Sequence, residues 1–245
     1  MSLDAGKSTA AYKAVEEELL PLLEAAHSKG EQLIVGIGSG STVVFVVEAI
    51  TKLDSKLTKP CIYVPTSFQA KHLILDAGLT LGSIETVPYV DIAIDGADEV
   101  DSQLNSIKGG GACHLQEKLV AKQAKKFIIV ADYTKDSKVL GEQWSKGIPL
   151  EVVPLGVNPV LNTLKQMGAT GKLRMSGGGK AGPVVTDHGN LVIDAHFSDM
   201  SKPVELEKDL KLICGVVEVG LFTNICNAAY FGNLDGTSVK RLPPQ

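Results

Sequence analysis

The feature that most constrains this chain is the regular alternation of short apolar strands with helices in its first half. The strand-like segments are LIVGI at 33–37, CIYVP at 61–65, VDIAID at 90–95 and FIIVAD at 127–132. Helical segments are expected between them at 42–53, 68–77 and 112–124. Continuous apolar strands that alternate with helices are typical of a parallel sheet covered on both faces. We therefore predict an α/β fold with a doubly wound, mostly parallel, Rossmann-like sheet.

A second, smaller domain is expected after Gly141, where the segments become shorter. Strand-like segments lie at 148–154, 172–175, 183–187, 191–197 and 216–222, and helices are expected at 159–167 and 203–212. Hairpin-like strands interleaved with two helices indicate a ferredoxin-like α+β domain of the βαββαβ kind. The last segment is too short to fold alone, so we expect it to return to the first domain. The predicted division is an α/β domain at 1–140 and 229–245 and a small α+β domain at 141–228.

An amphipathic helix, or a pair of short helices, is expected at 8–29, before the first strand. Its apolar residues recur at helical spacing, Pro21 interrupts it and Gly30 ends it. No basic region followed by an apolar stretch opens the chain, and no later run of about 18 apolar residues occurs. We therefore expect a cytoplasmic protein without a membrane partner.

The charge balance bears on the kind of ligand. The chain has 24 Lys and Arg against 28 Asp and Glu, a formal net charge of -4, and no basic block. Nucleic acid is disfavoured as a partner, because the electrostatic footprint of phosphate-backbone binding is missing. If the ligand is an anion, positive charge has to be supplied locally. The four cysteines form no Cys-x-x-Cys pair and have no histidines at zinc-ligand spacing, so we expect them to be reduced.

Glycines gather in three clusters, and the first, GIGSGST at 36–42, follows a strand and precedes a helix. Such a turn brings backbone amides and hydroxyl groups together at a helix N-terminus, where a small phosphate fits. The dinucleotide fingerprint G-x-G-x-x-G is not matched, because Ser41 takes its third glycine position, and no Walker A motif is present, so NAD and ATP are disfavoured. An ordinary strand-to-helix turn with a Ser/Thr cap is the alternative. The candidate phosphate-binding residues are Ser39, Gly40, Ser41 and Thr42.

Five carboxylates lie within eleven residues at the end of the segment 90–95, namely Asp91, Asp95, Asp98, Glu99 and Asp101. In open α/β sheets the ligand lies beyond the carboxyl ends of the strands, so Asp95 and Asp98 are expected to face a pocket. Crowded carboxylates raise one another's pKa, as an acid/base catalyst near neutral pH requires. A hard-metal site and a solvated acidic turn are the alternatives, although the spacing of a calcium loop is absent. The candidate substrate-binding residues of this turn are Asp95, Gly96, Ala97 and Asp98.

The second glycine cluster lies in KGGGACHLQEK at 108–118, at the start of a helix. Its lysine supplies local positive charge, its glycine amides are able to point at an oxyanion, and its glutamate lies well inside the helix. A solvated Glu–Lys pair is the alternative, and His114 is expected to cap or pack. The candidate residues are Lys108, Gly109, Gly110, Gly111 and Glu117.

Lys135 follows the strand at 127–132 and also lies beyond a carboxyl end, with a surface lysine as the alternative. The third glycine cluster, at 177–179, is expected to be a hairpin connection. Arg174 and Lys180 flank it and are candidates for contact with an anionic group, although nothing in the spacing requires it. The role of His188 stays open.

Together these segments supply a phosphate-binding turn, an acidic pair, two lysines and a helical glutamate. No metal-ligand set and no organic-cofactor motif accompanies them, so no cofactor and no metal are expected. The set suits proton transfer next to a carbonyl group on a small phosphorylated molecule.

Several of these motifs, in this order, resemble the family of type A ribose-5-phosphate isomerases. They are GIGSGST, PTS at 65–67, AIDGADEVD, NSIKGGGA followed by LQEKLVA, IIVADYTK, PLEVVP, GPVVTD and GVVEVGLF. The match covers about residues 33–235, and DGADE with KGGGA and a downstream Glu is specific to the family. The resemblance implies interconversion of D-ribose 5-phosphate and D-ribulose 5-phosphate in the non-oxidative pentose phosphate pathway. It also implies a metal-free reaction and a homodimer or larger homo-oligomer.

The resemblance implies a role for each candidate residue. The general base falls on Glu117, the substrate-binding aspartates on Asp95 and Asp98, and the active-site lysines on Lys108 and Lys135. Asp95, with Lys108, would assist opening of the furanose ring. Glu117 would then move a proton between carbon 2 and carbon 1 through a cis-enediolate, whose oxyanion the lysine and the glycine amides would stabilise.

Two departures from the family pattern are Gln116, where Arg is common, and His188 in TDHGN, where TDNGN is common. Gln116 leaves the charge environment of Glu117 open. Two alternative functions are a non-catalytic sugar-phosphate sensor and an acyl-CoA transferase on a related fold, which would use a glutamate as nucleophile.

Overall fold

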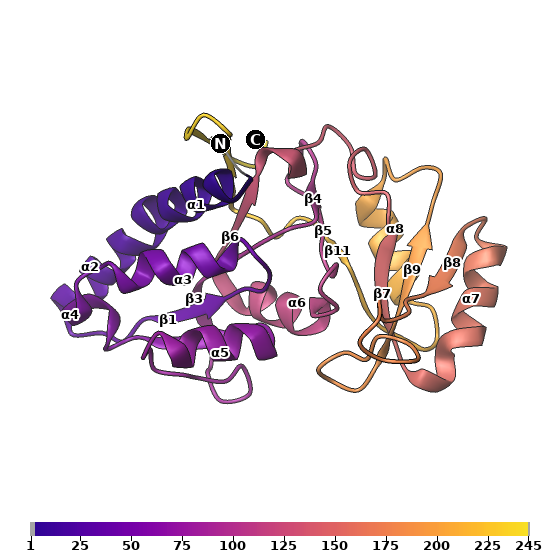
Figure 1. The fold of residues 1–245 in the computed structure, drawn as a ribbon, viewed down its shortest axis with the longest axis horizontal. Coiled ribbons are helices and arrows are strands. Elements are labelled where there is room, and N and C mark those ends of the chain that lie inside the picture. Colours follow the sequence, from indigo (N-terminus) through magenta and orange to yellow (C-terminus); the bar gives the residue numbers. More distant parts are fainter. Residues whose placement is uncertain (1–2, 245) are drawn as a thin grey trace. The chain divides into compact units, whose positions relative to one another are not determined.

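The computed structural model describes residues 3–244, which form two compact units (Figure 1). Unit 1 contains the described residues up to Ala97, residues 116–136 and those from Ile225 onward. Unit 2 contains residues 98–115 and 137–224. The second glycine cluster therefore belongs to unit 2, and the first belongs to unit 1.

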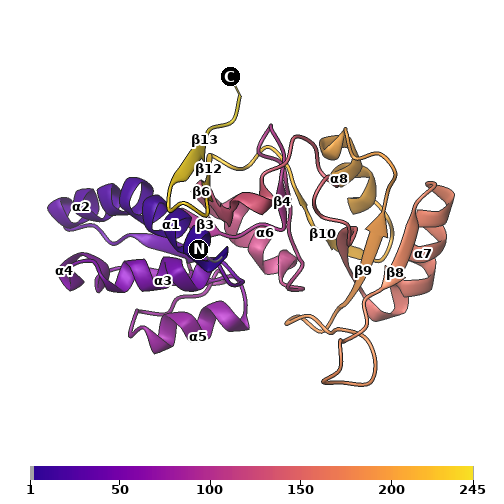
Figure 2. The same ribbon diagram turned by 45° about the horizontal axis from the view of Figure 1, so that its top comes forward.

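A six-stranded sheet forms the centre of unit 1, in the order β13-β12-β6-β3-β1-β2. Neighbouring strands are parallel except β12 and β13, which form an antiparallel edge pair (Figure 2). The chain moves outward from β1 to β2 and then returns to β3 on the other side of β1, so the strand order reverses at β1 and β3. The doubly wound, mostly parallel sheet predicted from the apolar segments is thus confirmed. The strands are β1 (Ile34–Ile37), β2 (Ile62–Pro65), β3 (Val90–Asp95), β6 (Ala124–Asp132), β12 (Ala228–Gly232) and β13 (Ser238–Arg241).

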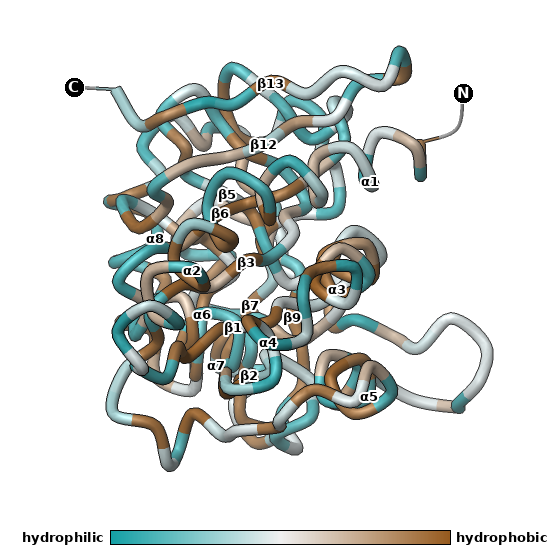
Figure 3. The backbone as a smooth tube through the Cα atoms, turned by 90° about the vertical axis from the view of Figure 1, so that its left-hand side faces the viewer, coloured by the Kyte–Doolittle hydropathy of each residue, from teal (hydrophilic) through white to brown (hydrophobic). Residues whose placement is uncertain are grey.

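Helices cover both faces of this sheet, which is why the central residues of its inner strands are apolar. Figure 3 shows the strands end-on, with α3 (Val43–Thr51) and α5 (Phe68–Asp76) on one side and α6 (His114–Gln123) on the other. Gly36 lets α6 approach β1 closely, because a Cβ atom there would lie 2.7 Å from Val120 Cγ1. The short helix α4 (Ser55–Thr58) lies between α3 and β2.

The N-terminal segment is helical from Leu3 to Lys29 and is interrupted by one π-helical turn. It runs through α1 (Leu3–Ala14), a π-helical turn (Val15–Leu19) and α2 (Leu20–Lys29). Pro21 lies in the first turn of α2, where its missing backbone N–H removes no hydrogen bond of that helix. The interruption that the sequence predicts near Pro21 is the π-helical turn that precedes α2. Gly30 ends the helix with a left-handed φ of 66°, as a C-terminal glycine does.

Unit 2 contains a four-stranded antiparallel sheet in the order β10-β7-β9-β8. Along the chain its elements follow the βαββαβ pattern that the sequence predicts. Apolar residues of these elements, among them Leu150, Leu164, Ile193 and Leu210, form one buried cluster. The elements are β7 (Ile148–Val152), α7 (Val157–Gln166), β8 (Thr170–Leu173), β9 (Leu191–His196), α8 (Pro203–Lys211) and β10 (Val216–Val219).

Two strand predictions in unit 2 are wrong. Residues 183–187 form no strand but only isolated bridges, Met175 with Pro183 and Val185 with Leu191. The expected strand 216–222 is divided at Gly220, where a Cβ atom would lie 2.3 Å from the Lys108 carbonyl oxygen. Its second part belongs to a small three-stranded sheet that the sequence does not predict, because two-residue strands carry no periodic pattern. That sheet consists of β4 (Glu99–Val100), β5 (Ser106–Ile107) and β11 (Leu221–Phe222).

Candidate active site

The topology of unit 1 indicates a candidate binding site at the carboxyl ends of β1 and β3. In an open parallel sheet the loops that follow two such strands leave in opposite directions, which opens a crevice between them. The loop after β1 is the first glycine cluster, and the residue that ends β3 is Asp95. Two of the sequence-predicted groups therefore meet at one point of the fold.

The loop after β1 is held against β3 by a close backbone approach at Gly38. Its N–H donates to the Ile94 carbonyl oxygen at 2.9 Å. A Cβ atom at position 38 would lie 2.1 Å from Asp95 Oδ1 and 2.5 Å from Asp95 Cα. Only glycine fits there, because the nearest obstacle includes backbone.

Asp95 is 1% exposed, and its Oδ1 accepts hydrogen bonds from the N–H groups of Ser39 (2.9 Å) and Gly96 (2.7 Å). Charge-assisted hydrogen bonds from backbone donors fix a carboxylate firmly. The carboxylate thus ties the loop after β1 to the turn that contains Gly96.

A cluster of hydroxyl groups borders the same loop. Ser39 Oγ lies 2.8 Å from Thr66 Oγ1 and donates to Ser67 Oγ at 2.5 Å. Gly40, with a left-handed φ of 100°, donates its N–H to Gln69 Oε1 at 2.8 Å. Thr42 precedes α3 without a side-chain capping bond, so the reading of this loop as a simple Ser/Thr cap has no support at that residue.

Thr66 and Ser67 follow β2 and were not among the candidate residues. Both are buried, and Ser67 also accepts the Ala70 N–H as the N-cap of α5. Their position beyond the carboxyl end of a parallel strand is the signal that could have identified them.

Glu117 lies on α6 and is 5% exposed. The preceding residue, Gln116, donates its Nε2 to the Pro65 carbonyl oxygen at 2.8 Å, which attaches α6 to the end of β2. A buried carboxylate on a helix fixed in this way is not a solvated surface Glu, so that alternative is wrong for Glu117. His114 is fully buried, as expected for a packing residue.

Lys135 lies in a short 3₁₀ turn (Tyr133–Lys135) directly after β6. The turn is capped by Asp132, whose Oδ1 accepts the Thr134 N–H at 3.0 Å. Because β6 is the neighbour of β3 in the sheet, Lys135 and Asp95 follow adjacent strand ends.

In unit 2, Asp98 is joined to the second glycine cluster. Its Oδ2 accepts the Gly110 N–H at 2.7 Å, and a Cβ atom at Gly110 would lie 2.5 Å from Asp98 Oδ1. Gly109 has a left-handed φ of 101°, and a Cβ atom there would lie 2.6 Å from His114 Nδ1. Gly109 and Gly110 are therefore required by their surroundings, whereas a Cβ atom at Gly111 would meet nothing within 4 Å.

Lys108 is 2% exposed, and its backbone N–H donates to the Gly220 carbonyl oxygen at 2.8 Å. Its Nζ lies 5.5 Å from the centre of the Phe222 ring, within range of a cation–π interaction. Lys108 is thus a buried lysine beside an aromatic face, at the start of the second glycine cluster.

The other three carboxylates of the acidic segment have structural partners. Asp91 accepts the Ile34 N–H and pairs with Lys125. Asp101 accepts the backbone N–H groups of residues 103 and 105 and so closes a turn. Glu99 is fully buried and accepts from the Ser137 hydroxyl and from the N–H groups of residues 141 and 143. Asp95 and Asp98 differ from these three in that they accept backbone N–H groups of the two glycine-rich loops that contain the other candidate residues.

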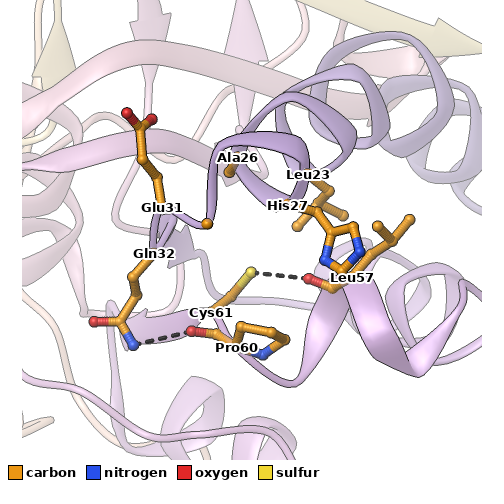
Figure 4. Close-up of a pocket in the computed structure, with 9 residues that line it drawn as sticks. Leu23, Ala26, His27, Glu31, Gln32, Leu57, Pro60 and Cys61 are labelled. Carbon is orange, nitrogen blue, oxygen red and sulfur yellow. Dashed lines mark hydrogen bonds between the residues drawn. The ribbon is translucent and has the colours of Figure 1, made fainter.

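A cavity of about 310 Å³ lies in unit 1 beside Gln32 and Cys61, which precede β1 and β2 (Figure 4). Gln32 Nε2 donates to the Pro60 carbonyl and Cys61 Sγ to the Leu57 carbonyl. Burial raises the pKa of the Cys61 thiol, which favours its protonated form. The cavity lies at the amino ends of the strands, where parallel sheets do not bind their ligands.

Within residues 3–244, no group of three or more His, Cys, Asp or Glu side chains is arranged to hold a metal ion. No helix in the described part of the chain has the length and apolar character needed to cross a bilayer. The arrangement instead offers carboxylates, lysines and amides, the groups used for proton transfer and oxyanion stabilisation.

Comparison with known proteins agrees with this chemistry. The family model for ribose 5-phosphate isomerase A (phosphoriboisomerase A) matches residues 62–236. A ribose-5-phosphate isomerase of Mycosarcoma maydis is 50% identical over 237 residues, which are 96% of this chain and 80% of that protein. One from Candida albicans is 49% identical over 239 residues, covering 96% of this chain and 95% of the other.

Solved structures give the same result. A D-ribose-5-phosphate isomerase in complex with phospho-erythronic acid is 34% identical, with a TM-score of 0.88 and coverage of 99% of this chain and all of the other. The ribose 5-phosphate isomerase of Plasmodium falciparum is 31% identical, with a TM-score of 0.85 over 99% of this chain and 100% of that one. On sequence and structure alike, this chain belongs to the ribose 5-phosphate isomerase A family.

Proposed function

We propose that this chain interconverts D-ribose 5-phosphate and D-ribulose 5-phosphate with Glu117 as the base that moves the proton. The observation that carries the proposal is the burial of Glu117 on a helix attached to the end of β2, in a chain of this isomerase family. A buried carboxylate is positioned and shielded for proton transfer as a solvated one is not. The reaction belongs to the pentose phosphate pathway.

Binding would begin at the loop after β1. The hydroxyls of Ser39, Ser41 and Thr42 and the amides of Ser41 and Thr42 would hold the phosphate at the N-terminus of α3. Gly40 would give the loop its left-handed turn, and the Ser39 N–H would stay with Asp95. Thr66 and Ser67 would support the hydroxyl of Ser39, which they contact. The net negative charge of the chain would not prevent this binding, because the hydrogen-bond donors of the loop lie next to the phosphate.

Ring opening and proton transfer would follow. Asp95, with Lys108, would move the proton between the ring oxygen and the carbon 1 hydroxyl, which releases the aldehyde. Glu117 would take the proton from carbon 2 of the aldose and return it to carbon 1 of the cis-enediolate, giving the ketose. Charge that develops on oxygen would be stabilised by Lys108 and by the amides of Gly109 and Gly111. The Gly110 amide, which donates to Asp98, would hold that carboxylate in place.

The remaining candidates would bind the sugar. Asp98 and Lys135 carry charges suited to the hydroxyls and the phosphate, and Gly96 and Ala97 shape the turn between the two aspartates. The sensor and transferase alternatives are not favoured, because the matching family model and relatives are isomerases.

We also infer that the chain works in the cytoplasm as a homodimer or larger homo-oligomer, without nucleic acid as a partner. The net charge of -4 and the absence of a basic block in the sequence support the last point. Light scattering on the purified chain measures its oligomeric state, and a monomeric mass would contradict the proposal.

The test of the function compares Glu117→Gln with the wild type in isomerisation and in binding of phospho-erythronic acid. That ligand carries a planar carboxylate where the reaction would carry an enediolate. We expect binding to persist while turnover falls by about three orders of magnitude, in the range for loss of a general base. Wild-type turnover in the mutant would refute the assignment of the base, and an inactive wild type would refute the function.

A further inference from the structure

Arginine is rare in this chain, and one of its two arginines lies against the second glycine cluster. The sequence has 24 Lys and Arg, of which Arg174 and Arg241 are the arginines. Arg174 directly follows β8, and its backbone N–H donates to the Val192 carbonyl oxygen at 2.8 Å. The backbone of Arg174 is therefore held by the sheet of unit 2 independently of its side chain.

The guanidinium group of Arg174 contacts three residues at once. Nε donates to Asp194 Oδ2 at 2.9 Å and Nη2 to Asp194 Oδ1 at 2.5 Å. Nη1 donates to the carbonyl oxygens of Gly109 at 2.9 Å and Gly110 at 3.1 Å. The side chains of Arg174 and Asp194 are 16% and 15% exposed. A planar fork with several donors makes this set of bonds, whereas the single ammonium of lysine does not.

One of these carbonyls belongs to the peptide unit that also contacts Asp98. The Gly109 carbonyl and the Gly110 N–H form one peptide plane, and that N–H donates to Asp98 Oδ2 at 2.7 Å. In a trans peptide the C=O and the N–H point in opposite directions. Arg174 therefore holds one edge of the plane and Asp98 the other. A donor on the carbonyl also polarises the peptide and strengthens its N–H as a donor.

The second carbonyl orients the next amide in the same way. Because Gly110 O faces Arg174, the Gly111 N–H of the same peptide points away from the guanidinium. Glycines are free to rotate about φ and ψ, so a run of three needs external contacts to hold its amides in one direction. The two bonds from Arg174 supply such contacts.

We propose that Arg174, oriented by Asp194, is a positioning residue that fixes the amides of Gly110 and Gly111 and, through the first of them, Asp98. The inference rests on the proposed function, in which the Gly111 amide and Asp98 serve the substrate. Arg174 itself acts through the loop and touches no reacting atom. The anion contact considered for Arg174 from the sequence is thus replaced by contacts with carbonyls and a carboxylate.

A solvent-connected cavity of about 370 Å³ makes the proposal testable by chemical rescue. Gly110, Arg174 and Asp194 line it, together with Lys172 and other residues of unit 2. Removing the arginine side chain would enlarge the cavity next to Asp194 and the two carbonyls. A free guanidinium ion carries the same planar donors and is small enough to enter this space.

The experiment measures isomerisation by the full chain as wild type, Arg174→Ala, Arg174→Lys and Asp194→Asn, with and without guanidinium chloride at tens of millimolar, far below denaturing concentrations. We expect Arg174→Ala to lower kcat/KM by about 100-fold, as loss of oriented amide donors does. Guanidinium should raise the kcat/KM of Arg174→Ala at least tenfold, and the rise should level off as the guanidinium concentration increases. Arg174→Lys should have a kcat/KM close to that of Arg174→Ala. Asp194→Asn should also lower kcat/KM, but by a smaller factor.

Lys211→Ala is the matched control. Lys211 in unit 2 also bridges a carboxylate, Glu218, and a backbone carbonyl, that of Val217, but it does not contact the glycine cluster. We expect its activity to equal that of the wild type and not to respond to guanidinium.

Several results would overturn the proposal. One is a wild-type kcat/KM in Arg174→Ala, and another is a wild-type kcat/KM in Arg174→Lys. A third is a folded Arg174→Ala variant whose lowered kcat/KM does not respond to guanidinium. If Arg174→Ala does not fold, wild-type activity in both Arg174→Lys and Asp194→Asn would overturn it equally. Absence of isomerisation in the wild type itself would instead overturn the proposed function, so the two failures are distinct.

Discussion

The Ser39 backbone N–H donates to Asp95 Oδ1 at 2.9 Å, although the two residues lie 56 positions apart in the chain. The bond joins the loop after β1 to the end of β3, at the point where the strand order of the sheet reverses. The group proposed to bind phosphate and the carboxylate proposed to assist ring opening are thus parts of one hydrogen-bonded unit. Changes that move the backbone at Ser39 or the carboxylate of Asp95 are expected to affect both steps.

Gly38→Ala tests the close approach behind this bond. The added Cβ atom would lie 2.1 Å from Asp95 Oδ1 and 2.5 Å from Asp95 Cα, so the loop or the strand end must shift. We expect kcat/KM to fall by at least about tenfold and the protein to lose about 1–3 kcal/mol of stability through overpacking. Steady-state kinetics and urea unfolding measure the two effects. Gly177→Ala is the control, since a Cβ atom there meets nothing within 4 Å, and equal losses in both variants would contradict the explanation.

Ser39→Ala tests the hydroxyl cluster. The variant keeps the backbone N–H that binds Asp95 but loses the contacts with Thr66 and Ser67. We expect KM for ribose 5-phosphate to rise about tenfold, the worth of a hydrogen bond to a charged group, with little change in kcat. Ser28→Ala, which removes an exposed hydroxyl at the end of α2, should leave KM unaltered. A selective fall in kcat for Ser39→Ala would argue against a role in phosphate binding.

The ionisation of Glu18 is expected to make the stability of the protein depend on pH. It lies in the π-helical turn, is 3% exposed, and contacts Lys126, Lys240 and Tyr230. Burial opposes ionisation, but hydrogen bonds from these three residues outweigh it and lower the pKa of the carboxyl from 4.5 to about 2. Because the folded pKa is the lower one, the stabilisation is fully present above about pH 4.5 and is lost as the pH falls toward 2.

Glu18→Gln measures this contribution. At neutral pH we expect the variant to lose up to about 3 kcal/mol in the free energy of unfolding, and the difference from the wild type to shrink below pH 4.5. Urea unfolding between pH 7 and pH 3 provides the comparison, with the exposed Glu24→Gln as control. A difference that stays constant across this range would show that the carboxylate does not titrate as described.

The sequence predicts well those parts of the fold that carry a periodic or continuous apolar pattern. The parallel strands and the βαββαβ order follow from such patterns. A strand buried on both faces is apolar along its length, and an element buried on one face has apolar residues at regular intervals. The two-residue strands β4 and β5 and the division of the last strand at Gly220 depend instead on contacts with distant backbone. No local pattern records such contacts.

The same distinction holds for the candidate site. Five neighbouring carboxylates look alike in the sequence, and only their partners distinguish Asp95 and Asp98 from Glu99, which anchors residues 137–143. The contact of Arg174 with Gly109 spans 65 residues and joins two loops that follow strands of different sheets, so spacing does not reveal it. Residues proposed for the chemistry were identifiable by motif, whereas residues that position them required the structure.

The proposed movement of a proton by Glu117 between carbon 2 and carbon 1 leaves a trace in isotope exchange with solvent. Ribulose 5-phosphate is incubated in D₂O with the wild type, with Glu117→Gln or with the control Glu24→Gln, and deuterium at carbon 1 is followed by NMR. We predict that the wild type and the control incorporate deuterium at carbon 1, and that Glu117→Gln does so at a rate lower by about three orders of magnitude. Incorporation by Glu117→Gln at the wild-type rate would contradict this role of Glu117.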